Sequence, residues 1–250
     1  MTRRLAVGLL IISLAQFLVP LLPVLGLGES IGSRATSGGR PPELPPGPFF
    51  SIWSVIFLAY FIFALLAVLK PSYLERRLGG ALLLAGVGNI AWMLSAQLVG
   101  NQLLDFLLLW PILAFAWTGA RRLHRMGGFD GTWRRANACV LTGLWSGWIA
   151  VAVSISVPAT WRGLSGLGPS DDVWISLWMA LVSAGLLAWL FASRVSASVL
   201  FFAALAWGLA GVALNNWYLT GMHWLSGASL LAGGYILWRR ARHGARAAFE

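Results

Sequence analysis

Long apolar runs alternate with short polar segments along the whole chain. Each run has close to the 20 residues that a helix needs to cross a hydrocarbon core of about 30 Å. The pattern therefore predicts an all-α, polytopic helical membrane protein with eight spans. They lie at about residues 5–28, 49–69, 79–99, 103–119, 137–158, 173–192, 197–214 and 221–238.

The composition supports a membrane protein and identifies the lipid bilayer as a partner. Hydrophobic residues make up 58% of the chain, charged residues 10%, and the mean hydropathy is +0.76. A soluble domain carries about 25% charged residues. The net charge of +10 comes from short basic clusters between the apolar runs, a pattern that indicates topology and predicts no nucleic-acid binding.

The distribution of Lys and Arg predicts the orientation of the spans. If the N-terminus is cytoplasmic, only Arg34, Arg40 and Arg162 of the 18 basic residues lie outside. The positive-inside rule then predicts a multi-pass protein of a bacterial inner (plasma) membrane, with both termini cytoplasmic. The first run also resembles a signal peptide, whose cleavage would leave seven spans in the same orientation.

Side chains typical of catalysis or metal binding are scarce within the spans. Asp105 and His223 fall near span ends, and the single cysteine, Cys139, predicts no disulfide. We therefore expect no catalytic residue, no metal site and no obligatory cofactor. An enzymatic hypothesis survives only as light-driven oxidation of a bound porphyrin, in which the ligand supplies the photochemistry.

Tryptophan is the conspicuous residue, with 15 copies. Several match interfacial belts, but six fall well inside the predicted spans: Trp92, Trp110, Trp145, Trp148, Trp178 and Trp207. Such indoles either fill a core or offer flat surfaces for stacking on a planar apolar ligand.

Small residues at a spacing of four predict close helix contacts. The pairs are Gly143 with Gly147, and Ser229 with Gly233. Internal packing is the favoured interpretation, and a homodimer is the alternative.

A proline-rich segment, 41-PPELPPGPFF-50, precedes the second run. One proline would suffice to start a helix. Five prolines fix the backbone more strongly and predict a lid that holds one shape over the mouth of the bundle.

Three motifs resemble the TspO/MBR family of tryptophan-rich sensory proteins. They are Pro45-Pro-Gly47-Pro-Phe-Phe50-Ser-Ile52-Trp53, Asn89-Ile-Ala-Trp92 and Trp145-Ser-Gly147-Trp148. The resemblance implies a five-helix transmembrane unit over residues 1–158. Residues 159–250 would form a three-span extension with a basic cytoplasmic tail.

The family resemblance also implies a function. It indicates a receptor or sensor that binds a planar hydrophobic ligand, of the porphyrin or haem type, in an aromatic pocket under the first loop. The implied site residues are Pro45, Gly47, Trp53, Asn89, Trp92, Trp145 and Trp148. The alternatives are a transporter of apolar small molecules and a non-catalytic scaffold or assembly factor that binds a membrane-complex partner.

The chain departs from the family pattern at four positions. Pro48 replaces a loop aromatic, Phe57 a tyrosine, Leu141 a proline and Ser156 an asparagine. These changes bear on the specificity for porphyrin rather than on the architecture.

Overall fold

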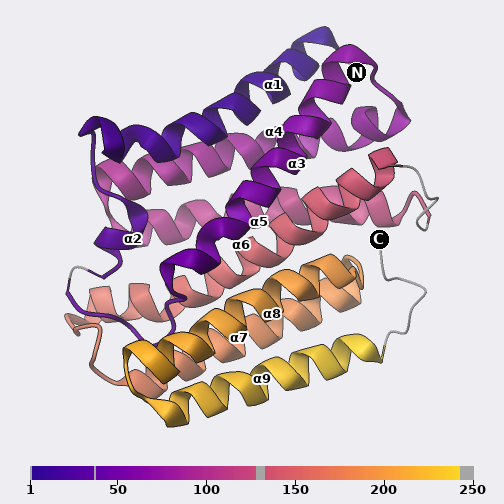
Figure 1. Ribbon diagram of the computed structural model, residues 1–250. Coiled ribbons are helices and arrows are strands. Elements are labelled where there is room, and N and C mark those ends of the chain that lie inside the picture. Colours follow the sequence, from indigo (N-terminus) through magenta and orange to yellow (C-terminus); the bar gives the residue numbers. More distant parts are fainter. Residues whose placement is uncertain (1, 37, 128–132, 243–250) are drawn as a thin grey trace.

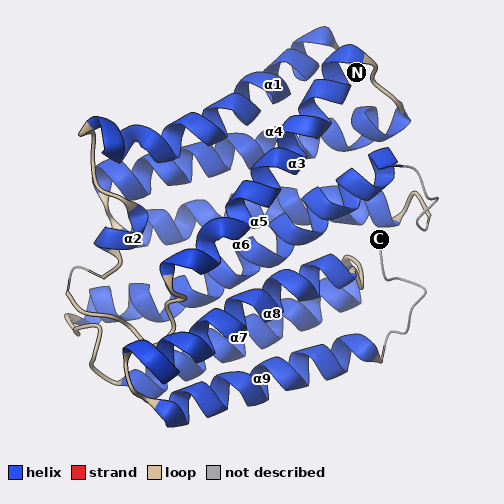
Figure 2. Cartoon of the chain, in the orientation of Figure 1, coloured by secondary structure: helices blue, strands red, loops and turns tan. Residues whose placement is uncertain are grey.

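A computed structural model describes all residues except 1, 37, 128–132 and 243–250. The described residues form helices joined by loops, with no strand among them (Figure 2). The all-α prediction is confirmed. The α-helices are α1 (Arg3–Leu18), α2 (Ile31–Arg34), α3 (Ile52–Leu69), α4 (Tyr73–Leu94), α5 (Gln102–His124), α6 (Trp133–Ser165), α7 (Val173–Arg194), α8 (Val199–Leu214) and α9 (His223–Ala241).

Several helices continue into short turns of other helical types. A 3-10 segment, Val19–Leu25, extends α1, and another, Gly47–Ser51, leads into α3. The π-helical turns Ser95–Val99 and Asn215–Leu219 extend α4 and α8. These turns lengthen the apolar segments toward the span lengths that the sequence predicts.

The long helices run back and forth beside one another (Figure 1). The start of α1 and the end of α9 lie at the same end of the bundle. This end also holds the α3–α4 and α7–α8 connections and most of the basic residues, and we call it the basic end. The opposite end, which holds the proline-rich segment, is the loop end.

Seven helical segments in the described part are long and apolar enough to cross a membrane. They correspond to the first seven predicted runs and support a multi-pass membrane protein. The eighth run forms α9, which packs against α7 and α8 but is not among the seven. The count of eight spans and the orientation of the termini stay predictions.

Helix α6 forms the centre of the bundle and contacts α3, α5, α7 and α8. It is longer than the predicted run 137–158 and passes the predicted unit boundary at residue 158 without a break. Three side chains near the end of α6 are buried: Pro158, Thr160 and Arg162. The packed part of the helix therefore extends beyond the most apolar stretch of its sequence.

The close contact between α6 and α8 depends on glycine. A Cβ atom on Gly147 would lie 2.4 Å from the carbonyl oxygen of Phe201, and one on Gly143 would lie 2.6 Å from Cβ of Leu200. In α9, a Cβ atom on Gly233 would lie 3.3 Å from Cδ1 of Leu209 in α8. The prediction that these small residues serve internal packing is therefore confirmed.

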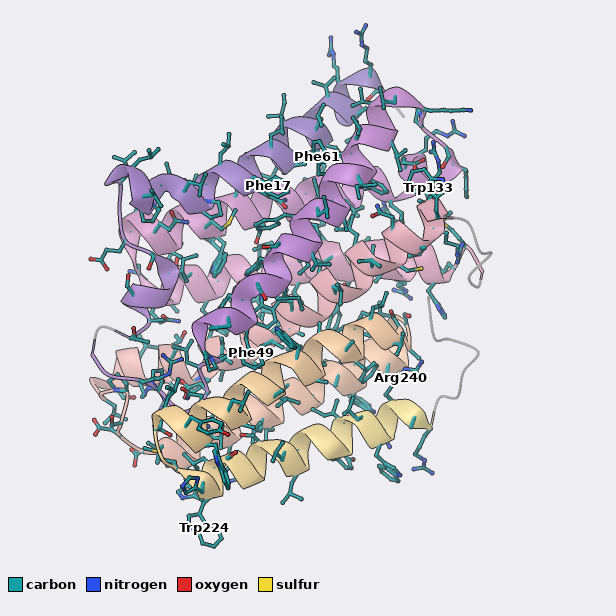
Figure 3. The ribbon with its side chains drawn as sticks, viewed as in Figure 1. Phe17, Phe49, Phe61, Trp133, Trp224 and Arg240 are labelled. Carbon is teal, nitrogen blue, oxygen red and sulfur yellow. The ribbon has the colours of Figure 1, made fainter. Side chains whose placement is uncertain are left out.

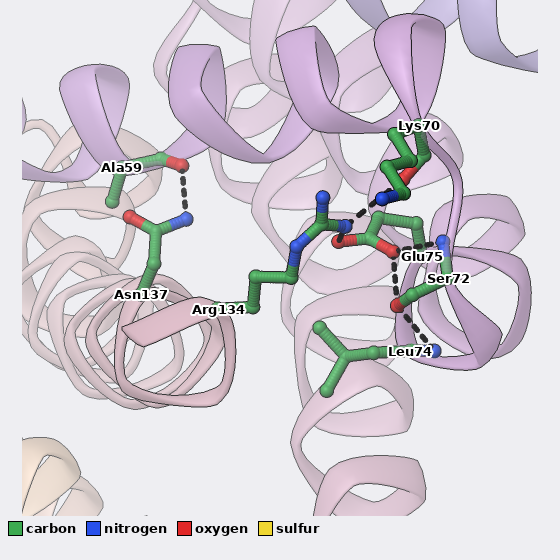
Figure 4. A network of polar contacts seen from close by, with 7 residues as sticks. All are labelled: Ala59, Lys70, Ser72, Leu74, Glu75, Arg134 and Asn137. Carbon is green, nitrogen blue, oxygen red and sulfur yellow. Dashed lines mark hydrogen bonds and ion pairs between the residues drawn. The ribbon is translucent and has the colours of Figure 1, made fainter. Parts of the chain in front are cut away.

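At the basic end, a network of polar contacts links α3 and α4 to α6 (Figure 4). Ser72 caps α4 together with Glu75, whose carboxylate is fully buried. Arg134 of α6 reaches this carboxylate at 3.1 Å and donates to the Lys70 carbonyl at 2.9 Å. Asn137 donates to the Ala59 carbonyl at 3.0 Å. These bonds attach the α3–α4 connection to the central helix.

Candidate functional site

Two of the predicted site residues, Trp53 and Trp92, stack on each other near the loop end. Trp53 lies in the first turn of α3 and Trp92 in the last turn of α4, with ring centroids 6.3 Å apart and an interplanar angle of 29°. The ring of Phe57 also contacts Trp53, with centroids 5.2 Å apart. Both indoles are partly buried, so the protein does not cover them completely.

The predicted tryptophans of α6 lie deeper. Trp145 and Trp148 are three residues apart, and both are buried. Trp145 meets Tyr60 of α3 edge-on at 5.4 Å, and Trp148 meets Phe50 edge-on at 5.6 Å. The aromatic groups thus come from the segment before α3 and from α3, α4 and α6.

Buried polar groups without hydrogen-bond partners accompany these rings. Both amide atoms of Asn89, both of Gln16 and the indole nitrogen of Trp145 lack a partner among the described residues. Leaving such a group unpaired costs about 1–3 kcal/mol. A ligand or water that supplied a partner would therefore be stabilised at these positions.

Gln16 and Tyr60 are members of this cluster that sequence reasoning missed. A Cβ atom on Gly86 of α4 would lie 2.7 Å from the Tyr60 hydroxyl oxygen and 3.2 Å from Nε2 of Gln16. The missing side chain at residue 86 thus makes room for two polar groups. Gln16 carries the only amide side chain of the first apolar run, which was the available signal.

The loop residues Pro45 and Gly47 both lie at the loop end, but they differ in burial. The segment that follows α2 runs along the loop end to α8 before α3 begins (Figure 1). Pro45 is buried against Gly211 of α8, 2.7 Å from the position that a Cβ atom would occupy there. Gly47 is exposed, with nothing within 4 Å of the corresponding position.

Residues 40–49, which we call the clamped loop, are held by polar side chains of α8 and the turn after it. Asn215 donates to the carbonyls of Pro41 and Pro42 at 3.1 and 3.2 Å, and Asn216 donates to that of Pro42 at 2.8 Å. Arg40 in turn donates to Asn215. Pro41 and Pro42 are both buried, so their carbonyl groups need hydrogen-bond partners within the protein.

Helix α8 holds the far end of the clamped loop as well. The indole of Trp207 donates to the Phe49 carbonyl at 2.8 Å and packs on the Phe49 ring, with centroids 4.6 Å apart. Phe49 lies where the start of α3 meets α8 (Figure 3).

A buried ion pair completes the attachment. Glu43 of the clamped loop binds Arg162 of α6, and their side chains are 2% and 6% exposed. Arg162 also donates to Ser176 of α7. Burial raises the pKa of Glu43, and the guanidinium of Arg162 opposes that rise. Two of the three basic residues predicted outside are therefore structural: Arg40 belongs to the clamped loop, and Arg162 of α6 holds it.

The other mid-span tryptophans do not join the aromatic site. Trp110, Trp178 and Trp207 are 44%, 47% and 42% exposed, on the outer surface of the bundle. Within the described residues, no group of three His, Cys, Asp or Glu side chains is arranged to hold a metal ion.

Comparison with known proteins identifies one family. A family model described as "TSPO-like protein" matches residues 28–238, from the segment before α2 into α9. No curated protein and no solved structure matches the chain. The matched region includes both the proline-rich loop and the parts of α6 and α8 that hold it.

Proposed function

This chain belongs to the family of TSPO-like proteins, and on that premise we propose that it is a receptor for a planar hydrophobic ligand. The family supports a membrane receptor or transporter role. Within that role, we assign a tetrapyrrole-like ligand to the aromatic groups of α3, α4 and α6, together with Gln16 of α1.

The observation that carries the proposal is the unpaired amide of Asn89 beside the tryptophan stack. Asn89 and Trp92 are three residues apart in α4, so they share a helix face. The indoles of Trp92 and Trp53 offer flat apolar surfaces, and the amide offers a donor and an acceptor to a polar edge of the ligand. Binding would also remove the cost of leaving the amide unpaired.

The clamped loop contributes rigidity to this proposed site. Phe50 follows the loop directly and contacts Trp148. Because α8 and α6 hold the loop in one position, little conformational entropy remains to be lost there when a ligand binds. These contacts support the predicted lid, which keeps one shape, as a fixed cover of the proposed site.

The direct test is a titration of the purified protein in detergent with protoporphyrin IX and with haem, followed by tryptophan fluorescence. We expect saturable quenching that is about tenfold weaker in affinity for Trp92→Ala, because one stacking face is lost. The control is Trp178→Ala, which removes an outward-facing indole of α7 and leaves the affinity unchanged. Non-saturable quenching, or equal effects of the two substitutions, would contradict the proposal.

Asn89→Leu separates a binding role of the amide from a structural one. Replacing an unpaired buried amide with an apolar group of similar size leaves the melting temperature unchanged or raises it. We expect porphyrin affinity to fall about tenfold in the same variant, since the polar partner is gone. A lower melting temperature with unchanged affinity would show that Asn89 serves the fold alone.

A further inference from the structure

A cavity of about 230 Å³ lies between α7, α8 and α9 at the basic end. None of the aromatic residues of the proposed receptor site lines it. Its apolar wall includes Trp189 of α7, Phe202 of α8 and Tyr235 of α9. Trp189 and Tyr235 are 50% and 58% exposed, so the cavity opens on the outer surface, where the bilayer would lie.

Two arginines stand at the polar side of this cavity. Arg239 is exposed and Arg240 is largely buried, and both belong to the last turn of α9. Figure 3 shows Arg240 at this end of the helix. Cations in a last turn interact favourably with the helix dipole, which explains their position along α9. Arg240 is 9% exposed and lines the cavity together with the aromatic residues of its wall.

The cavity combines a cationic rim with an apolar, laterally open interior. Basic pockets between membrane helices bind anionic lipid headgroups, and each nearby arginine adds to the attraction. A small soluble anion would use the rim but would gain nothing from the aromatic wall. A zwitterionic lipid would use the wall, but its own cation would weaken its attraction to the arginines.

We propose that this cavity binds an anionic phospholipid, with its phosphate at Arg239 and Arg240 and the start of an acyl chain against Trp189, Phe202 and Tyr235. The occupant is a lipid rather than free phosphate, because most of the lining is apolar. The site is separate from the proposed receptor site, so each can be tested without the other.

Native mass spectrometry of the full chain, released from neutral detergent, tests the proposal with phosphatidylglycerol and phosphatidylcholine as probes. We expect one phosphatidylglycerol to be retained in preference to phosphatidylcholine. The double variant Arg239→Gln/Arg240→Gln should bind it roughly 25-fold more weakly, at about fivefold for each arginine. Arg242→Gln is the matched control, because Arg242 lies over the Trp238 ring and does not line the cavity.

A second variant fills the apolar part of the cavity. A Cβ atom on Gly185 would have no neighbour within 4 Å, so Gly185→Leu extends into the cavity and is compatible with the fold. We expect it to abolish retention of phosphatidylglycerol. Gly227→Leu, at an equally open position of α9 outside the cavity, should leave retention unchanged.

Three outcomes would overturn the proposal: equal retention of both lipids, unchanged retention in the double glutamine variant, or unchanged retention in Gly185→Leu. Displacement of the lipid by millimolar inorganic phosphate would also overturn it, since it would assign the rim to a free anion. Trp92→Ala should retain the lipid normally, which distinguishes this site from the receptor site.

Discussion

Arg162→Met is expected to lower the free energy of unfolding by about 3–5 kcal/mol, because it leaves the carboxylate of Glu43 buried without its cation. The same substitution removes the hydrogen bond to Ser176, so it also loosens the contact between α6 and α7. Unfolding in mixed detergent measures the stability. Hydrogen exchange at the amides of residues 43, 44, 47, 49 and 50 reports on the clamped loop itself.

Two control variants test whether the stability lost in Arg162→Met comes from the unpaired carboxylate of Glu43. Arg194→Met removes an exposed arginine and should change stability by less than about 0.5 kcal/mol. The double variant Glu43→Leu/Arg162→Met replaces the whole pair with apolar groups and should regain most of the lost stability, as buried ion pairs replaced in this way often do. A loss below about 1 kcal/mol in the single variant would mean that water reaches the carboxylate.

Gly147→Val is expected to cost about 3 kcal/mol or more, because α6 and α8 cannot both keep their places. Even the first added carbon would lie 2.4 Å from the carbonyl oxygen of Phe201 and 2.8 Å from Cβ of Ala204. The nearest obstacle is backbone, so the clash is relieved only when one helix moves, and overpacking of this kind is destabilising. Movement of α8 would also displace Trp207 and Asn215 from the clamped loop.

The matched control for this glycine is Gly185→Ala, where nothing lies within 4 Å of the added atom. There the higher helix propensity of alanine should leave stability unchanged or raise it by up to about 1 kcal/mol. Both variants are measured by unfolding in mixed detergent, with exchange at the clamped loop as a second measurement. A Gly147→Val variant as stable as Gly185→Ala would contradict the argument that α6 and α8 require a glycine contact.

The helices could be predicted from the sequence, because a long apolar segment in a membrane must satisfy its backbone hydrogen bonds internally and does so as a helix. The sequence could not tell which indoles face inward. Trp92 and Trp110 both sit in apolar surroundings along the chain, but one meets Trp53 and the other is 44% exposed. Lipid and protein interior are equally apolar, so hydrophobic pattern does not distinguish a lipid-facing position from a core position.

The polar contacts of the clamped loop were beyond sequence reasoning for a different reason. Asn215 and Pro41 are 174 residues apart, and Arg162 and Glu43 are 119 apart. Periodicity and motif spacing report on neighbours within one element and carry no information about such pairs. Gln16 was visible as a lone amide in an apolar run, but only the fold places it opposite Gly86.

The clamped loop also imposes an order on biosynthesis. Its partners in α8 and the following turn are translated 158 to 175 residues after the loop residues that they bind. At elongation rates of about 5–20 residues per second, that delay is roughly 8–35 seconds. During this interval the first five long helices can enter the membrane, but the Pro41 and Pro42 carbonyls still lack Asn215 and Asn216. The first loop of this protein is therefore among the last parts to reach its final conformation, because α8 and the turn after it must be made before the loop is complete.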